Sequence, residues 1–490
     1  MKLKHLLKQL PLLEVIGSKE IDIAGITANS KFVAPGSLFI AIRGTKFDGN
    51  RFIPEAISSG AVCVLSDIFD PSLSVTQLVT PDVASMGAFL AAAFWNWPSR
   101  ELTIVGITGT SGKTTTSYIV RHLLAHFGIT SGLIGTVSHI IGSRTYDADH
   151  TTPDVVTTHR LLREVARSGS SACVMEVSSH ALAQGRVEHV DFDIGIFTNL
   201  SHEHLDYHKT MDEYALAKNR LFRTLGKGEK KEALAVINGQ DPWATTVSEG
   251  TAARVVTFAI EGEADVMASH LKLTPTSTTF DLSYGGNTVP VHLPLVGRFN
   301  VANALAASSA FLARGYSLRD VAAGLATACS PPGRLEKVEN CRGLTIFVDY
   351  AHKVDALRKV LVCLRESTRG RLITIFGCGG DRDREKRPMM AKASEELSDL
   401  TIVTSDNPRS EDPGAIIDQI CRGFSGENHL VVPDRRQAIF KAVQCATPHD
   451  VVLIAGKGHE KYQIFAHDTV PFDDCQVAAE CCLISQREGQ

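Results

Sequence analysis

Residues 105–120, VGITGTSGKTTTSYIV, combine an apolar strand-like run, a loop of glycines and small hydroxyl residues, and a helix-like pattern. Backbone amides in such a loop can surround a phosphate, and the positive end of the following helix adds to the attraction. The usual loop has a glycine five residues before Gly112, where this chain has Ile107. The glycines, lysine and hydroxyl residues needed for phosphate binding are nevertheless present. We therefore expect nucleotide binding; a plain glycine turn with an exposed lysine is the alternative. The expected contacts are Gly109, Thr110, Ser111, Gly112, Lys113, Thr114 and Thr115.

Apolar segments alternate with helix-like segments through most of the chain, which indicates parallel sheets covered on both faces by helices. The central series is ELTIVGIT, SACVMEVSS, FDIGIFTNL and ALAVIN, and another runs from GLTIFVDYAH to VVLIAGKG. A chain of 490 residues also exceeds what one hydrophobic core usually serves. We expect an α/β protein of three domains, with a central P-loop parallel sheet and a C-terminal Rossmann-like domain. The expected bounds are 1–99, 100–331 and 332–490.

Turn signals mark two further features. Gly285, Gly286 and Asn287 predict a hairpin within residues 280–296. The segment Pro331 to Gly333 is the best linker candidate, and we expect the third domain to hinge there and close over the reaction site.

The composition is that of an ordinary globular protein, with 44% hydrophobic and 21% charged residues and a net charge of −4. This charge argues against a polyanion-binding protein, so we expect no nucleic-acid partner. Charges and a proline interrupt the first 20 residues before a signal-peptide core forms, and no run of about 20 apolar residues follows, so no membrane partner is expected. The 11 cysteines are scattered without a C-x-x-C pair. They are typical of reduced thiols in a cytoplasmic protein, with metal binding or catalysis as the alternative.

Two polar residues stand at predicted strand ends, where ligands bind in open parallel sheets. Glu176 closes one strand in VMEVSSHAL, and His204 follows the next in FTNLSHEHLDYH. With a hydroxyl from Thr114 or Thr115, they can complete a site for a metal that bridges phosphates, while Lys113 reaches the outer phosphate oxygens. A hydrogen-bonded structural histidine and a solvated glutamate are the alternative.

Many further motifs occur together, and with them nearly the whole chain resembles the Mur ligases. These are ATP-dependent enzymes that add amino acids to the peptide of the bacterial cell-wall precursor in the cytoplasm. The motifs, in family order, are TGTSGKTTT, Thr151-Thr152, EVSSHAL, FTNLSHEHLDYH, YALAKNRLF, GRFNVANALAA, GRLE, DYAH, GDRD, DNPR and AGKGHE. The resemblance implies that residues 1–99 bind a UDP-linked substrate, 100–331 bind ATP and 332–490 bind the amino acid, in a monomer.

The resemblance also implies roles for single residues. Lys113, Glu176, His204 and Lys218 would be catalytic. Thr114, Glu176, His204 and Lys218 would hold Mg²⁺, with Lys218 converted by CO₂ to a carbamate, an anionic oxygen ligand. Asn303, Arg334 and Asp349 would contact the adenosine half of ATP, unless they are structural. Ser30, Thr151, Thr152, Ser178, Gln184 and Arg186 would bind UDP-N-acetylmuramoyl-L-alanyl-D-glutamate.

Within the family, DNPR resembles the branch that adds meso-diaminopimelate. Lysine and meso-diaminopimelate differ by one carboxylate, and a fixed cation with paired donors can discriminate it. The residues Asp406, Asn407, Pro408 and Arg409 would form this pocket together with Arg382, Gly456 and Glu460. Arg382 would pair with a carboxylate and Glu460 with an ammonium group. A common Asn-Pro turn with a surface arginine is the alternative.

The chain departs from the family pattern at two places. Ser30 stands in Asn-Ser-Lys where Asp-Ser-Arg is common, and Lys353 and Val354 follow DYAH where Thr-Pro is usual. The implied reaction is phosphorylation of the D-glutamate side-chain carboxylate, followed by attack of the amine on the acyl phosphate. A lysine-adding ligase, a folylpolyglutamate synthetase, and a nucleotide-dependent switch or binding protein are the rival interpretations.

Overall fold

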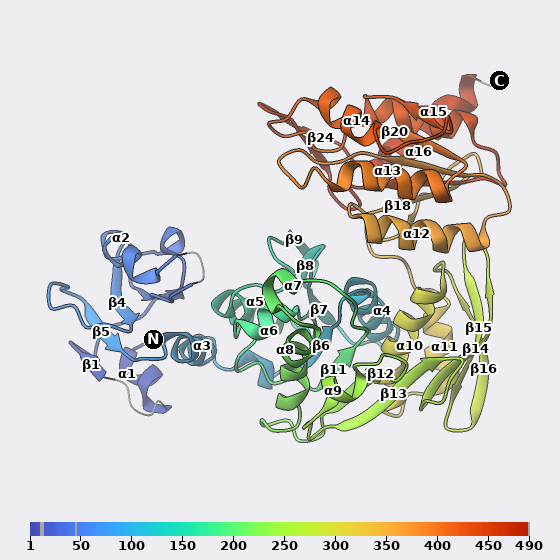
Figure 1. Ribbon diagram of the computed structural model, residues 1–490. Helices are drawn as coiled ribbons and strands as arrows, with labels where there is room; N and C mark the ends of the chain where they lie inside the picture. Colours follow the sequence, from blue (N-terminus) through green and yellow to red (C-terminus); the bar gives the residue numbers. More distant parts are fainter. Residues whose placement is uncertain (10–13, 45–46, 489–490) are drawn as a thin grey trace. The chain divides into compact units, whose positions relative to one another are not determined.

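The structure, a computed structural model, describes residues 1–9, 14–44 and 47–488. It has two compact units, one formed by Met1–Phe258 with Ser309–Arg314 and the other by Ala259–Ser308 with Gly315–Gln490. Sheets occur in an N-terminal, a central and a C-terminal domain, which confirms the predicted three-domain α/β class (Figure 1). In the described part of the chain, no helix is long and apolar enough to span a bilayer.

The N-terminal domain is built on a five-stranded sheet of order β1-β5-β4-β3-β2, in which only β1 is antiparallel to its neighbour. The predicted strands SLFIAIRG and AVCVLS are confirmed as β3 and β4, whose side chains are almost all buried. The strands are β1 (Glu14–Ile16), β2 (Gly25–Thr27), β3 (Ser37–Ile40), β4 (Ala61–Ser66) and β5 (Thr76–Val79). The helices are α1 (Leu3–Leu6), α2 (Ile53–Ser58) and α3 (Val83–Phe94), with 3₁₀ turns η1 (Leu7–Gln9), η2 (Ser30–Phe32), η3 (Gly49–Phe52) and η4 (Pro98–Arg100).

The central domain contains parallel strands in the order β13-β12-β11-β6-β10-β7, followed by the antiparallel strands β8 and β9. The four predicted apolar segments are confirmed as β6, β10, β11 and β12, and nearly every residue in them is buried, as expected between two helical layers. The strands are β6 (Thr103–Thr108), β7 (Ser131–Ile134), β8 (Ser138–Ile141), β9 (Arg144–Asp147), β10 (Ala172–Glu176), β11 (Ile194–Phe197), β12 (Leu234–Asn238) and β13 (Arg254–Ile260). The helices are α4 (Lys113–His126), α5 (Val155–Arg167), α6 (Ser179–Ala183), α7 (Leu205–His208), α8 (Met211–Thr224) and α9 (Ala244–Ser248).

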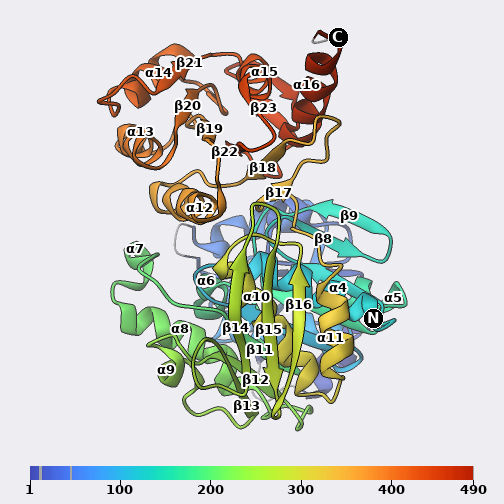
Figure 2. The same ribbon diagram turned by 90° about the vertical axis from the view of Figure 1, so that its right-hand side faces the viewer.

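The second unit begins with an antiparallel meander covered by helices. The predicted hairpin is confirmed: Tyr284 pairs with Asn287, and Gly285 and Gly286 form the two-residue turn with φ of +58° and +78°. Helix α11 packs on β15 and β16 (Figure 2). The elements are β14 (Val266–Leu273), β15 (Thr278–Tyr284), β16 (Asn287–Leu293), α10 (Arg298–Leu312) and α11 (Leu318–Leu325).

The C-terminal domain has a six-stranded sheet of order β17-β18-β22-β19-β20-β21, parallel except for β17. Helices α12, α13 and α14 cover one face, while α15 and α16 cover the other (Figure 2). The strands are β17 (Glu336–Lys337), β18 (Thr345–Asp349), β19 (Leu372–Phe376), β20 (Leu400–Val403), β21 (His429–Val431) and β22 (Val451–Ala455), with a separate hairpin of β23 (Tyr462–Ile464) and β24 (Thr469–Pro471). The helices are α12 (Val354–Ser367), α13 (Lys386–Leu397), α14 (Pro413–Cys421), α15 (Arg435–Cys445) and α16 (Asp474–Glu488).

The predicted linker ends in a packed residue. Gly333 is buried, its carbonyl accepts a hydrogen bond from Tyr350 N at 2.9 Å, and an added Cβ would overlap the backbone at Gly458 and His459. Its φ of +65° also favours glycine. Gly333 is therefore held within the C-terminal domain.

Candidate active site

The phosphate loop joins β6 to α4 and turns at two glycines. Gly109 and Gly112 have φ of +151° and +84°, and an added Cβ at Gly109 would overlap Thr198 Oγ1. Lys113 begins the helix, and its Nζ donates to the carbonyls of Gly109 and Thr110 at 2.8 and 2.9 Å. The lysine therefore folds back over the loop, within reach of a ligand that the loop amides would bind.

The loop is fixed from outside by the residues that follow β11. Asn199 Oδ1 accepts a hydrogen bond from Ser111 N at 3.0 Å, and its Nδ2 donates to Ser111 O at 3.1 Å. Thr198 Oγ1 donates to the same carbonyl at 2.7 Å. Sequence reasoning did not single out Thr198 or Asn199, although both stand at a strand end within FTNL.

Glu176 ends β10 and is fully buried beside the phosphate loop, where its carboxylate accepts hydrogen bonds from hydroxyl groups. Its Oε2 accepts hydrogen bonds from Thr114 Oγ1 at 3.0 Å and Thr136 Oγ1 at 2.9 Å, and its Oε1 accepts one from Thr136 N at 2.9 Å. Thr136 Oγ1 also lies 3.0 Å from Thr151 Oγ1. The structure thus brings the predicted metal ligands Thr114 and Glu176 together. Thr136 was missed, although it stands just after β7, where a strand-end search would have found it.

The other residues predicted to hold the sugar-peptide substrate also lie together. Thr152 Oγ1 donates to Glu176 O at 2.9 Å and accepts from Ser178 N at 3.1 Å. Arg186 donates from Nη1 to Thr152 O at 3.0 Å and from Nη2 to Gln184 Oε1 at 2.7 Å. These side chains form one hydrogen-bonded group next to the carboxylate of Glu176.

Lys218 lies on α8 with its side chain buried against the same loop. Its Nζ donates to Gly109 O at 2.9 Å and lies 4.5 Å from the ring centre of Tyr214. Burial, with the positive charge of Lys113 nearby, lowers the pKa of Lys218 well below its usual value. A lowered pKa increases the share of neutral amine, which is the form that reacts with electrophiles.

Further aromatic rings lie around Tyr214, the ring next to this lysine. His204 has a left-handed φ of +60° and its ring lies 6.0 Å from that of Tyr214 and 4.9 Å from that of His180. His208 stacks on Tyr214 at 5.1 Å, and burial lowers its pKa to about 4. Of the predicted ligands, Thr114 thus pairs with Glu176 and Lys218 contacts the phosphate loop at Gly109. His204 and Lys218 both approach the ring of Tyr214. Within the described residues, no group of three or more His, Cys, Asp or Glu side chains is arranged to hold a metal.

In the second unit, the carboxyl ends of β19, β20 and β22 carry the residues predicted to bind an amino acid. Asp406 and Asn407 are buried, and Asn407 Nδ2 donates to Glu460 Oε2 at 2.8 Å. Gly456 has a φ of +114°, and an added Cβ would press on Asp406 Oδ2. The structure therefore brings DNPR and AGKGHE into contact.

The two predicted arginines of this pocket lie beside Gly379. Arg409 has a left-handed φ of +52°, and its Nη1 donates to Gly380 O at 2.9 Å. A Cβ added at Gly379 would lie 2.8 Å from Arg409 Nη1 and 3.8 Å from Arg382 Cγ. Arg382 is exposed and Arg409 is half-buried. Two cationic side chains beside Gly379 can pair with a carboxylate.

An ion pair between a buried arginine and a partly exposed glutamate links the segments that follow β19 and β20. Arg387 is fully buried, and its Nη1 and Nη2 donate to Glu411 Oε2 and Oε1 at 3.0 and 2.9 Å. Glu411 Oε1 also accepts from Asp381 N at 2.7 Å. The hydrogen bonds from Arg387, followed by the one from the Asp381 amide, lower the pKa of Glu411 to about 2. Sequence reasoning missed this pair.

The three residues predicted for adenosine also lie in the second unit. Asn303 is buried and its Nδ2 donates to Asn300 Oδ1 at 3.1 Å. Asp349 accepts from Leu335 N at 2.7 Å and Ala351 N at 2.8 Å, which supports a structural part in holding the left-handed Leu335. Arg334 lies 5.1 Å from the ring of Tyr350.

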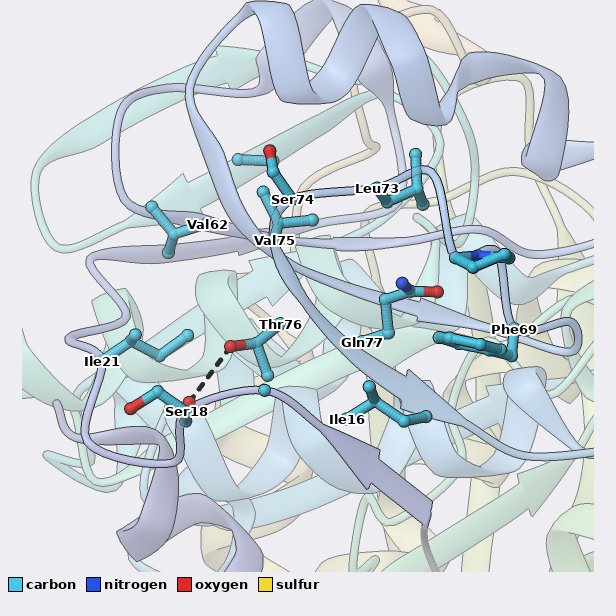
Figure 3. Close-up of a pocket in the computed structure, with 13 residues that line it drawn as sticks. Ile16, Ser18, Ile21, Val62, Phe69, Leu73, Ser74, Val75, Thr76 and Gln77 are labelled. Carbon is cyan, nitrogen blue, oxygen red and sulfur yellow. Dashed lines mark hydrogen bonds between the residues drawn. The ribbon is translucent and has the colours of Figure 1, made fainter.

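Ser30 begins η2, just after the carboxyl end of β2, and is half-buried. A hollow of about 560 Å³ lies elsewhere in this domain, at the amino ends of β4 and β5 (Figure 3). Val62, Phe69 and Leu73 line it, and Thr76 Oγ1 donates to Ser18 O at 3.1 Å. The strands β2, β3, β4 and β5 are parallel. Ser30 therefore lies at the carboxyl ends of these strands and the hollow at their amino ends.

Comparison with known proteins agrees with these motifs. Three family models match the chain: "Mur ligase family, catalytic domain" at 22–89, "Mur ligase middle domain" at 107–311, and "Mur ligase, glutamate ligase domain" at 333–458. A UDP-N-acetylmuramoyl-L-alanyl-D-glutamate–2,6-diaminopimelate ligase of Geobacillus thermodenitrificans is 42% identical over 482 residues, which cover 98% of each chain. The chain belongs to the Mur ligase family.

Other Mur ligases are similar to this chain in sequence or in fold. A ligase of the same name from Chlamydia felis is 42% identical over 485 residues, covering 98% of this chain and 99% of its own. A solved structure of a ligase with that name is 31% identical, with a TM-score of 0.73 and 99% coverage of both chains. MurF of Thermotoga maritima, solved with ADP, shares the fold at 18% identity and a TM-score of 0.63, covering 96% of this chain and 99% of its own.

One departure from the Mur ligase pattern leaves the local structure intact. Helix α12 begins at Val354, directly after Lys353, although the usual proline is absent. His352 Nδ1 lies 2.8 Å from Tyr350 O, and Lys386 Nζ donates to His352 O at 2.8 Å. These contacts secure the turn after DYAH.

Proposed function

We propose that this chain is an ATP-dependent ligase that joins meso-2,6-diaminopimelate to the D-glutamate side-chain carboxylate of UDP-N-acetylmuramoyl-L-alanyl-D-glutamate. The product is a cytoplasmic precursor of peptidoglycan, on which cell shape and division depend. The observation that carries the proposal is the presence in one chain of a P-loop-like turn and, in the other unit, a cluster that contains Arg409, Asn407 and Glu460. Relatives 42% identical over 98% of the chain carry the name of this activity.

In the first step, a carboxylate oxygen of D-glutamate attacks the γ-phosphorus of ATP and ADP leaves, which gives an acyl phosphate. Lys113 leaves the carbonyls of Gly109 and Thr110 and neutralises charge on the transferred phosphoryl group. Residues 109–115 hold the phosphates, and the group formed by Thr151, Thr152, Ser178, Gln184 and Arg186 orients the sugar peptide.

In the second step, an amine of diaminopimelate attacks the acyl carbon, phosphate leaves, and the nitrogen loses a proton. Arg409 and Arg382 pair with a carboxylate of the amino acid, and Glu460 holds an ammonium group. We assign Asn303, Arg334 and Asp349 to the adenosine half of ATP, Asp349 in addition to its part in holding Leu335, and Ser30 to the uridine end. The domains proposed for these tasks are 1–99 for the UDP substrate, 100–331 for ATP and 332–490 for the amino acid.

The donor set beside the phosphate loop fits Mg²⁺, because the buried Glu176 carboxylate and the Thr114 hydroxyl are oxygen ligands. His204 completes the proposed set with Lys218, whose buried amine would carry a carbamate after reaction with CO₂ and loss of a proton. When bound, Mg²⁺ would offset negative charge on the phosphates.

Phosphate release from ATP tests the proposal. The purified protein is given UDP-N-acetylmuramoyl-L-alanyl-D-glutamate with meso-diaminopimelate, lysine, ornithine or no amino acid. We expect release only with meso-diaminopimelate. Strong release with lysine would overturn the assigned amino acid, and release that ignores every amino acid, or occurs only with a folate substrate, would overturn the ligase assignment.

A further inference from the structure

Lys457 is a buried cation in the loop after β22, between the two halves of the amino-acid pocket. Its side chain has no exposed surface. Its Nζ donates to Asn407 Oδ1 at 3.0 Å and lies 3.5 Å from Glu460 Oε2. The ring centre of Tyr462 is 5.7 Å away. Burying an ammonium group is costly, so a lysine kept here must be well partnered.

The contact with Lys457 determines which way the Asn407 amide points. Oδ1 accepts two hydrogen bonds, one from Lys457 Nζ and one from Ile464 N at 3.1 Å. An amide oxygen has two acceptor sites, and both are used. Rotating the amide by 180° would turn its NH₂ group toward these two donors. Lys457 Nζ, Ile464 N and the NH₂ group would then all lack acceptors. The amide is therefore held with Nδ2 directed to Glu460.

This orientation leaves a donor and an acceptor for a ligand. Asn407 Nδ2 has two N–H bonds, and in the described part of the chain one of them donates to Glu460 Oε2 at 2.8 Å. The contacts of Asn407 and Lys457 with Glu460 both use Oε2. The side chain of Glu460 is 21% exposed. The remaining N–H of Asn407 and Oε1 of Glu460 thus suit a carboxylate and an ammonium group, the two ends of an amino-acid zwitterion.

We propose that Lys457 is a positioning residue for the amino-acid substrate: by holding Asn407 Oδ1, it directs the Asn407 amide donor toward a substrate carboxylate beside the ammonium-binding Glu460. This inference rests on the proposed ligase function. It gives Lys457 no part in phosphoryl transfer. Its loss therefore weakens amino-acid binding and leaves the nucleotide and the sugar peptide unaffected.

The test compares Lys457→Met with the matched control Lys461→Met. Lys461 lies four residues away, and its side chain is 77% exposed. For Lys457→Met we expect the KM for meso-diaminopimelate to rise about tenfold or more, as for loss of an oriented buried hydrogen bond, with kcat lowered less than about threefold. The KM values for ATP and the sugar peptide stay within about twofold, and Lys461→Met matches the wild type. An unchanged KM for meso-diaminopimelate, or equal rises for all three substrates, overturns the proposal.

A double-mutant cycle tests whether Lys457 acts through Asn407. Adding Lys457→Met to Asn407→Ala should change the KM for meso-diaminopimelate less than about twofold further, because the oriented amide is already gone. Fully additive losses contradict the mechanism. Melting curves show whether each variant folds. If Lys457→Met does not fold, Lys457→Gln, which keeps a hydrogen-bond donor, replaces it. Lys457→Gln should raise the KM for meso-diaminopimelate less than Asn407→Ala does. Wild-type phosphate release that ignores meso-diaminopimelate would instead overturn the underlying ligase function.

Discussion

The phosphate loop and the amino-acid pocket are built in opposite ways. The loop is seven consecutive residues, and its proposed function, phosphate binding, rests on backbone amides and on the glycines at 109 and 112. The side chain of Asn199 accepts a hydrogen bond from it. The proposed pocket takes its side chains from the ends of three strands and holds them through charged residues, Lys457 and the pair Arg387–Glu411. A site formed by backbone groups can be recognised from a short sequence motif. A site formed by side chains depends on partners that lie far apart in the sequence.

The largest effect is expected from the phosphate loop. Lys113→Met should lower kcat about 10³-fold, because it removes the cation proposed to neutralise the transferred phosphoryl group. Steady-state phosphate release measures this, and the exposed Lys231→Met serves as the control. Melting curves of both variants check that the fold is retained. A loss below about tenfold would mean that backbone amides do most of the work.

In the amino-acid pocket, we expect the next largest effect from Glu411→Gln. The substitution leaves the fully buried Arg387 without its carboxylate, which should cost about 3 kcal/mol of domain stability and raise the KM for meso-diaminopimelate. Calorimetric melting and kinetics measure the two effects. The control is Glu480→Gln, which breaks an exposed pair with Arg436 and should leave the melting temperature nearly unchanged. Equal costs in both variants would show that the pocket does not depend on the buried pair.

The same carboxylate predicts a pH dependence that distinguishes the two regions. The pKa of Glu411 is lowered from its usual 4.5 to about 2, chiefly by Arg387, so its contribution to stability is complete above pH 4.5 and is lost as the pH falls toward 2. The difference in melting temperature between wild type and Glu411→Gln should therefore be constant from pH 5 to 7 and shrink below pH 4. A difference that stays constant down to pH 2.5 would contradict the assigned pKa. Lys113→Met should show no such trend relative to wild type.

Sequence patterns were sufficient for the buried parallel strands, the hairpin turn and the strand-end residue Glu176. Buried apolar runs predicted β6, β10, β11 and β12, the glycine pair predicted the hairpin turn, and Glu176 stood where ligands bind in parallel sheets. The missed residues are of another kind. Thr136 and Asn199 also stand at strand ends, but their importance comes from hydrogen bonds to residues 40 and 88 positions away.

The pairing of Arg387 with Glu411 could not be predicted from local pattern. It depends on two loops folding against each other so that an arginine on α13 meets a glutamate after DNPR. Nor does anything in AGKGHE indicate that its lysine would be buried, because a lysine between two glycines is more often solvated. For the amino-acid pocket, the family resemblance supplied the residues, and the structure supplied the contacts that orient them.

The smallest effect is expected from Asn199→Ala, which tests how far the phosphate loop maintains its own conformation. The substitution removes two hydrogen bonds to Ser111, at 3.0 and 3.1 Å, but Thr198 Oγ1 still holds Ser111 O and Thr110 N still donates to residue 199 through the backbone. We expect a loss of about 1 kcal/mol in ATP binding, seen as a roughly fivefold rise in its KM, with the KM for meso-diaminopimelate unchanged. Asn407→Ala, the same substitution in the amino-acid pocket, should give the reverse pattern. If Asn199→Ala instead abolished ATP binding, the loop would depend on remote side chains as much as the pocket does, and the contrast between the two sites would not hold.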